Sequence, residues 1–169
     1  MQKLNRRQVR WRHVVFFLTA LLVLVADQLS KTWIRAYPEG QTLFEVGFFR
    51  IVHVHNTGAA FGLFTGQSFP LSIVALVGIA VLLVYAFFIY RHFPRLNNVL
   101  TRVALGLVLG GTVGNLIDRL NPNLRGVTDF ISIGFWPAFN VADSAVVAGV
   151  IIFAYSLLFL AGAEKGSAG

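Results

Sequence analysis

Four long apolar runs constrain this chain more than any other feature of its sequence. They cover roughly residues 13–34, 69–90, 99–117 and 139–160, and each is close to the about 20 helical residues needed to cross a hydrocarbon core. Backbone polar groups must pair within the segment in lipid, so such runs predict transmembrane helices. All five prolines fall between the runs or at their ends, where a helix tolerates them. We therefore expect residues 1–169 to form one integral membrane domain.

The basic residues predict how the helices are oriented. Lys and Arg gather before the first run and around the turn between the second and third runs, and such flanks stay in the cytoplasm. These residues are Lys3, Arg6, Arg7, Arg10, Arg12, Arg91, Arg95 and Arg102. Four spans then place both termini in the cytoplasm. Because this topology signal accounts for the net charge of +7, we do not expect nucleic acid as a partner.

The segment after the first run has a different character from the helices. It contains "TLFEVGFFRIVHVHNTGAAFGLF", which is dense in Val, Ile, Phe and Thr and partly alternates over residues 50–55. That pattern predicts a short sheet or hairpin lying on the outer membrane surface. The expected fold class is therefore an all-α polytopic membrane protein with four transmembrane helices and a small extracytoplasmic β-sheet, or cradle.

The few acidic residues gather toward one leaflet in this topology. Only 12% of the chain is charged, and an Asp at mid-helix costs roughly 2.5–3.5 kcal/mol on insertion scales, so each needs a partner or a cavity. Asp27 has Lys31 four residues later on the same helix face, which suits an ion pair as well as a functional role. Asp118 precedes Arg119 at a helix end, which favours a structural ion-pair network.

Two other aspartates have no adjacent basic residue. Asp129 lies in "VTDFI", which we expect in the last outer loop, and Asp143 lies in "NVADSAV", about one turn inside the fourth helix. Apolar surroundings raise the pKa of a carboxyl group, and two carboxyl groups brought close together share one proton. A catalytic pair is one reading of this arrangement, and a structural role is the other.

Small and polar residues complete the candidate set. Gly106, Gly110 and Gly114 recur at every fourth position in "GLVLGGTVG", which is typical of close helix packing in membranes. Asn115 follows them and could bond across helices. His53 and His55 would share a strand face, but a metal would need a third ligand, and the chain has no Cys. We expect no metal and no cofactor.

Five motifs occur in a fixed order along the chain. They are "DQLSK" at 27–31, "NTGAAFG" at 56–62, "GGTVGNLIDR" at 110–119, "VTDFI" at 127–131 and "FNVADS" at 139–144. With them the chain resembles bacterial lipoprotein signal peptidase, also called signal peptidase II, over essentially its whole length. The stretch between Arg119 and Gly126 matches no motif of that family.

The resemblance implies an aspartic endopeptidase of the bacterial cytoplasmic (inner) membrane with its active site toward the outer leaflet. Such an enzyme removes the signal peptide of a diacylglyceryl-modified prolipoprotein just before the lipidated lipobox cysteine, and globomycin-type inhibitors block it. The implied catalytic pair is Asp129 and Asp143. The implied supporting residues are Asp27, Lys31, Asn56, Asn115, Arg119 and Asn140. By the same comparison Asp118, Gly110 and Gly114 are structural.

Two other classes of membrane protein stay open at this point. A small proton-coupled transporter also keeps carboxylates in helices, although it usually places them near the midplane and shows repeated halves. A non-catalytic membrane assembly protein would explain the glycine-rich helix. The expected partners are the prolipoprotein substrate and membrane lipids, and nothing in the sequence demands more than a monomer.

Overall fold

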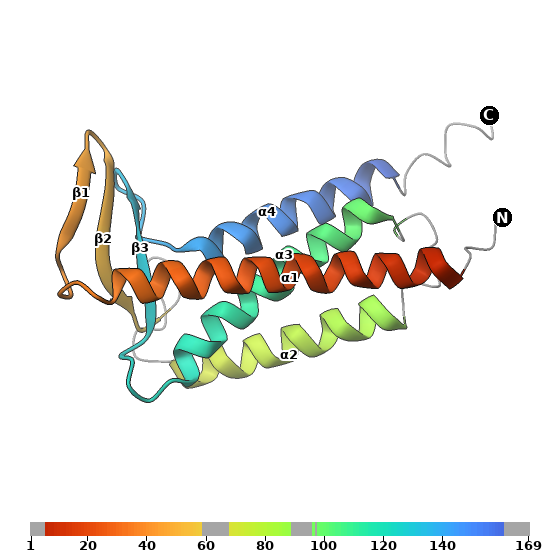
Figure 1. Cartoon of the computed structure of the whole chain (residues 1–169), viewed down its shortest axis with the longest axis horizontal. Coiled ribbons are helices and arrows are strands. Elements are labelled where there is room, and N and C mark those ends of the chain that lie inside the picture. The colour runs from red at the N-terminus through yellow and green to blue at the C-terminus, as the bar shows by residue number, and fades with distance from the viewer. Residues whose placement is uncertain (1–5, 59–67, 89–95, 97, 161–169) are drawn as a thin grey trace.

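The computed structural model describes residues 6–58, 68–88, 96 and 98–160, with four helices side by side and a small sheet across one end of the bundle (Figure 1). The elements are α1 (Arg6–Ile34), β1 (Thr42–Val46), β2 (Phe49–Asn56), α2 (Ser68–Phe87), α3 (Val99–Leu120), β3 (Val127–Ile133), α4 (Val141–Tyr155) and a π-helical turn (Ser156–Leu160). Some residues named in the predictions lie outside the described part of the chain. These are Lys3, Arg91 and Arg95 of the basic flanks and residues 59–62 of the second motif. The side chains of Arg6 and Arg7 lie outside the described part as well.

All four described helices are long and apolar enough to cross a membrane. The qualifying segments are Arg10–Ile34, Phe69–Phe87, Val99–Leu120 and Val141–Leu158, which confirms the predicted four-helix fold. Helix α1 begins at Arg6, before the predicted start near residue 13, and two further boundaries that differ bear on the site. Helix α3 continues to Leu120, so Asp118 and Arg119 lie in its last turn. Helix α4 begins only at Val141, because Asn140 caps it.

Helix α3 packs in the centre of the bundle because its glycines allow close approach. A Cβ atom placed on Gly110 would lie 2.5 Å from the carbonyl oxygen of Ala20 in α1. Gly111 of α3 meets Ala142 of α4 in the same way. Small residues at such contacts let helix backbones approach each other, which is how helices associate in lipid. The predicted role of the glycine repeat in helix packing is confirmed by this geometry.

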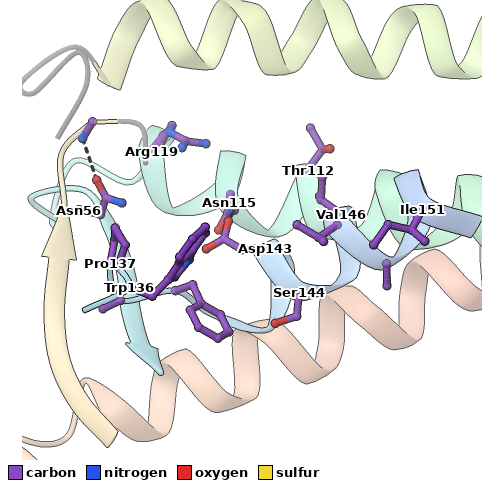
Figure 2. Close-up of a pocket in the computed structure, with 15 residues that line it drawn as sticks. Asn56, Thr112, Asn115, Arg119, Trp136, Pro137, Asp143, Ser144, Val146 and Ile151 are labelled. Carbon is purple, nitrogen blue, oxygen red and sulfur yellow. Dashed lines mark hydrogen bonds between the residues drawn. The ribbon is translucent and has the colours of Figure 1, made fainter. Parts of the chain in front are cut away.

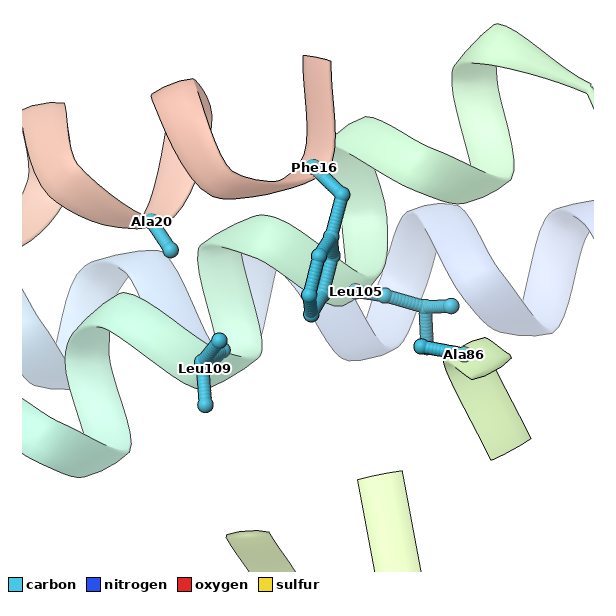
Figure 3. Close-up of a cluster of buried hydrophobic side chains, with 5 residues drawn as sticks. All are labelled: Phe16, Ala20, Ala86, Leu105 and Leu109. Atoms are coloured by element: carbon cyan, nitrogen blue, oxygen red, sulfur yellow. The ribbon is translucent and has the colours of Figure 1, made fainter. Parts of the chain in front are cut away.

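An apolar cluster holds the half of the bundle that lies away from the sheet. It joins α1, α2 and α3 through buried side chains that point toward one another (Figure 3). The cluster consists of Phe16, Ala20, Ala86, Leu105 and Leu109. Most of the buried charged and amide side chains, including Asp27, Lys31 and Asn115, lie in the opposite half, next to the sheet. Arg102 is the exception among the buried charged residues described: its Nη1 donates to the carbonyl oxygen of Ala86 at 2.8 Å, beside the apolar cluster.

The sheet is three-stranded and antiparallel, in the order β1-β2-β3. It confirms that a small sheet accompanies the helices, and it contains one strand more than a hairpin of the first outer segment would have. The sequence VTDFISI of β3 is rich in β-branched residues and pairs with β2. The expectation that Asp129 lies in a loop is therefore wrong, because Asp129 is in β3 and pairs with Val54.

Candidate active site

Asn140 joins the two aspartates that lack adjacent basic residues. It is the N-cap of α4, and its side-chain oxygen accepts a hydrogen bond from the main-chain N of Asp143 at 2.9 Å. In return its own main-chain N donates to Asp143 Oδ2 at 3.2 Å, a reciprocal capping box. The side-chain Nδ2 of Asn140 donates to Asp129 Oδ1 at 2.6 Å. One asparagine therefore contacts both carboxylates.

Asp129 lies in β3 and is only 2% exposed. Besides Asn140, it accepts a hydrogen bond from Asn56 Nδ2 at 2.9 Å on its other oxygen. Burial, with the nearby charge of Asp143 as a second cause, raises the pKa of Asp129 to about 7 against the opposing effect of the two amide hydrogen bonds. Such a carboxyl group exchanges a proton near neutral pH.

Asn115 of α3 links Asp143 to a buried lysine. Its Nδ2 donates to Asp143 Oδ1 at 2.7 Å, and its Oδ1 accepts from Lys31 Nζ at 2.8 Å. The Lys31 ammonium can only donate, so the amide oxygen must face Lys31 and the amide nitrogen must face Asp143. Lys31 thereby ensures that Asp143 receives a hydrogen bond from the amide nitrogen of Asn115.

A cluster of buried charges supports this arrangement. Lys31 Nζ lies 2.8 Å from Asp27 Oδ2 and 3.3 Å from Asp118 Oδ2, and all three side chains are fully buried. The second oxygen of Asp27 accepts from the main-chain N of Ala142 at 3.0 Å, so it also helps to hold the start of α4. The predicted Asp27–Lys31 ion pair is confirmed, as part of a larger network.

Asp118 belongs to an ion-pair network at the end of α3, as predicted, but its partners come from α1 and the residue after it, and not from the adjacent Arg119. Asp118 binds Lys31 and, at 2.7 Å, Nη2 of Arg35. Successive helical residues point about 100° apart, so Asp118 faces the bundle while Arg119 lines a cavity. The charge of Arg119 interacts there with those of Asp143 and Asp129.

The cavity has a volume of about 750 Å³ and lies against α3, α4 and the segment after β3 (Figure 2). Its polar end contains Asn56, Asn115, Arg119 and Asp143. Its remaining wall is mostly apolar and includes Trp136, Pro137, Phe139, Val146, Val147 and Ile151. Asp129 is not among the lining residues, although its hydrogen-bond partner Asn56 is.

The structure thus brings the sequence-based candidates to one end of the bundle, next to the sheet. Gly114 belongs there too, because a Cβ atom on it would lie 2.5 Å from Asp27 Oδ2. Gly110 lies further along α3, at the contact with α1. The rings of His53 and His55 contact each other, with centroids 4.9 Å apart, and His53 Nδ1 lies 2.7 Å from the carbonyl oxygen of Tyr37. The part of the chain that the structure describes contains no group of three potential metal ligands.

Three residues at the site were missed by sequence reasoning. The side chain of Gln28 contacts Asp27 at 3.2 Å and Asp118 at 3.3 Å. Arg35 and Thr128 bond each other at 2.8 Å. Helical spacing could have found Arg35, because it follows Lys31 by four residues and Asp27 by eight. Nothing in the sequence around Thr128 indicated its contact with α1.

This arrangement suits general acid–base chemistry. Two carboxylates connected through one asparagine differ in their surroundings, since Asp129 is buried and Asp143 lines the cavity. Pairs of this kind can divide the roles of proton acceptor and proton donor. Among the described residues, the side-chain hydrogen-bond donors to the two carboxylates are the amides of Asn56, Asn115 and Asn140. Amides keep their charge state over the working pH range, so these donors do not compete for the proton.

Comparisons with known proteins agree with this chemistry. The family model described as signal peptidase (SPase) II matches residues 19–159. A lipoprotein signal peptidase of Dehalococcoides mccartyi (strain CBDB1) is 48% identical over 141 residues, covering 83% of this chain and 86% of the relative. That of Moorella thermoacetica is 44% identical over 153 residues, covering 89% and 97%. A solved bacterial membrane enzyme superposes with a TM-score of 0.77 at 29% identity, covering 91% of this chain and 92% of its own.

Proposed function

The chain belongs to the signal peptidase II family, and we propose that Asp129 and Asp143 are the catalytic pair with which it cleaves its substrate. As a member of this family the protein is an aspartic endopeptidase of the membrane that removes the signal peptide from prolipoproteins. The observation that carries the assignment of the pair is the shared contact with Asn140, through its side chain to Asp129 and its main-chain N to Asp143.

The two carboxyl groups divide the proton transfers between them. Asp143 lines the cavity and, when ionised, removes a proton from the attacking water. Asp129, whose pKa of about 7 leaves much of it protonated at neutral pH, donates a proton to the scissile carbonyl oxygen. A tetrahedral diol forms, and its collapse delivers a proton to the leaving amine. General acid–base steps of this kind typically contribute 10²–10⁴-fold each.

The polar side chains around the pair orient the reactants. Asn115 donates a hydrogen bond to one oxygen of Asp143. Asn56 donates one to an oxygen of Asp129. Arg119 is a cation in the cavity wall, suited to bind a carbonyl oxygen of the peptide or of the lipid ester. Asp27, Lys31 and Asp118 form the buried network that fixes Asn115 and the start of α4.

The cavity suits a lipid-modified peptide as substrate. Beyond its polar end the wall is formed by apolar residues of α4, including Val146, Val147 and Ile151. A signal-peptide helix and two acyl chains are apolar ligands that reach such a wall from the lipid. We propose that the peptide is cleaved just before its diacylglyceryl-modified cysteine, which places the cut at the polar end beside Asp143.

The basic flanks support a location in the cytoplasmic membrane with both termini inside. Arg10, Arg12 and Arg102 belong to these flanks, and the sheet with the catalytic pair lies at the opposite end of the bundle (Figure 1). The active site then faces the outer leaflet. The family match favours this peptidase over the transporter and over the assembly protein.

Cleavage of a defined prolipoprotein tests the proposal. Purified full-length protein in lipid vesicles is mixed with one prolipoprotein in two forms, with and without the diacylglyceryl group. We expect cleavage of the modified form immediately before the modified cysteine, and inhibition by globomycin. Equal cleavage of the unmodified form would contradict the proposed substrate, and a cut elsewhere would contradict the proposed placement of the peptide.

A further inference from the structure

We propose that Arg35 is a positioning residue that acts through Thr128 to fix strand β3, so that Asp129 meets its amide partners. The inference rests on the catalytic role proposed above for Asp129. Arg35 lies just beyond the end of α1, belongs to none of the five sequence motifs, and does not line the cavity.

Arg35, Thr128 and Asp118 form a closed ring of contacts. Arg35 Nε donates to Thr128 Oγ1 at 2.8 Å, and Arg35 Nη2 lies 2.7 Å from Asp118 Oδ1. The main-chain N of Thr128 donates to Asp118 Oδ2 at 3.0 Å. Thr128 is 0% exposed and Asp118 is 1% exposed. The ring therefore connects the ends of α1 and α3 to β3, at the residue immediately before Asp129.

The sheet itself restrains Asp129 only weakly on one side. Ile131 of β3 pairs with Ile51 of β2, and Asp129 pairs with Val54. Three residue steps along β2 therefore face two steps along β3, which is a β-bulge. A bulge disrupts the hydrogen-bond ladder locally and re-aims side chains. On the C-terminal side of Asp129 the main-chain N of Phe130 donates to the carbonyl oxygen of Phe139 at 3.0 Å, and on its N-terminal side the ring holds Thr128.

The face that Asp129 presents depends on this restraint. Successive residues of a strand point to opposite faces, and a slip of one residue exchanges them. The hydroxyl of Thr128 is bound to Arg35 from α1, so Asp129 is directed to the other face. Its partner Asn56 is found there, as the diagonal neighbour that pairs with Val127.

The guanidinium group suits this task better than an ammonium group. Its planar fork reaches two acceptors in fixed directions, here a hydroxyl oxygen and a carboxylate oxygen. Arg50 of β2 offers a matched comparison, because its side chain also contacts strand β3. Arg50 Nη2 donates to Ser132 Oγ at 3.3 Å, three residues after Asp129 and beyond the bulge. Arg50 should therefore leave Asp129 unaffected.

Steady-state cleavage of diacylglyceryl-modified prolipoprotein by full-length variants in lipid vesicles tests the inference. Thr128→Val removes the hydroxyl but keeps the Arg35–Asp118 ion pair. Thr128→Val and Arg35→Gln, each as a single substitution, should lower kcat by about tenfold to a hundredfold with little change in KM. This is the scale of a small misplacement of a reacting group. Thr128→Ser and Arg50→Gln should match the wild type, and Arg35→Lys should be intermediate.

The pH profile separates positioning from simple stability. Weaker amide hydrogen bonds favour the ionised form of Asp129 less, so the high-pH limb of kcat/KM should move to higher pH in Thr128→Val. If Thr128→Val and Arg35→Gln both keep the wild-type kcat and the wild-type pH profile of kcat/KM, the inference is overturned, whatever happens to the melting temperature. If Arg35→Gln fails to fold, Thr128→Val alone decides.

Failure of this inference differs from failure of the proposed function. If Asp129→Asn cleaves at the wild-type rate, the catalytic pair itself is wrong. If Asp129→Asn is inactive while Thr128→Val retains wild-type kcat and pH limbs, the pair stands and only the role of Arg35 is rejected.

Discussion

Asn140 and Asp143 hold each other by two reciprocal hydrogen bonds, from Asp143 N to Asn140 Oδ1 at 2.9 Å and from Asn140 N to Asp143 Oδ2 at 3.2 Å. The capping interaction uses the oxygen of the Asn140 side chain. It leaves the amide nitrogen to bind Asp129. One residue thus starts helix α4 and aligns two carboxylates from different elements.

These two tasks of Asn140 can be separated by substitution. Ser caps a helix about as well as Asn, but it has no amide nitrogen to reach Asp129. Asn140→Ser should therefore keep the cap and lose most of its cleavage activity, whereas Asn140→Ala should be about 1 kcal/mol less stable than Asn140→Ser because it also loses the cap. Thermal unfolding and cleavage rates measured on both variants check this. Full activity in Asn140→Ser would mean that the contact with Asp129 is dispensable.

The buried Lys31 should be essential for stability. Lys31→Met leaves Asp27 buried without its cation and Asp118 with Arg35 alone, and breaking a buried ion pair on one side costs about 3–5 kcal/mol. Adding Asp27→Asn should recover part of this loss, because an amide oxygen can still accept from Ala142 N. Chemical unfolding of both single variants and the double variant measures the coupling. Additive losses would show that the two residues do not interact energetically.

Gly114 should not tolerate a side chain. A Cβ atom there would lie 2.5 Å from Asp27 Oδ2, and overpacking of this kind typically costs about 1–3 kcal/mol. The matched control is Gly78→Ala in α2, where a Cβ atom has no neighbour within 4 Å among the described residues. We expect a lower melting temperature for Gly114→Ala and an unchanged or slightly higher one for Gly78→Ala. Equal melting temperatures would contradict the close contact with Asp27.

Activity should fall as pH rises through about 7. Burial and the charge of Asp143 raise the pKa of Asp129 to about 7, so the proton that the pair shares is lost above that pH. The same shift affects stability. The folded protein binds this proton more tightly than the unfolded chain does, so the contribution of Asp129 to stability is present below the unfolded pKa, near 4, and is lost as pH rises through about 7.

Two measurements check this pH dependence. The kcat/KM profile reports the free enzyme and should show a descending limb near pH 7. In thermal unfolding, Asp129→Asn should remove part of the fall in stability between pH 4 and 7. A profile that stays flat to pH 9 would contradict the raised pKa. The limb belongs to the coupled pair rather than to one residue.

The sequence predicted the membrane architecture because hydrophobic length is a direct physical requirement of the bilayer. The same topology predicted that Asp27, Asp118, Asp129 and Asp143 gather at one end of the chain's helices. The ion pair of Asp27 with Lys31 followed from helical spacing alone.

The sequence did not predict contacts between distant elements. The sequence indicated an ion-pair network at Asp118, but it did not indicate that Lys31 and Arg35 are its partners. Asp129 was placed in a loop because VTDFISI becomes a strand only when β2 lies beside it. The link between Arg35 and Thr128 joins positions 93 residues apart, and no local pattern carries such information.

The most direct test of the central claim measures the rate at which the single variants Asp129→Asn and Asp143→Asn cleave prolipoprotein in lipid vesicles. The charge-matched control is Glu45→Gln, at an exposed residue of strand β1. Both aspartate variants should still fold and insert into the membrane, yet cleave diacylglyceryl-modified prolipoprotein at least about 10²-fold more slowly, the lower end of a general acid–base contribution. Glu45→Gln should retain the wild-type rate. A near wild-type rate in either Asp129→Asn or Asp143→Asn would contradict the assignment of the two carboxylates as the catalytic pair.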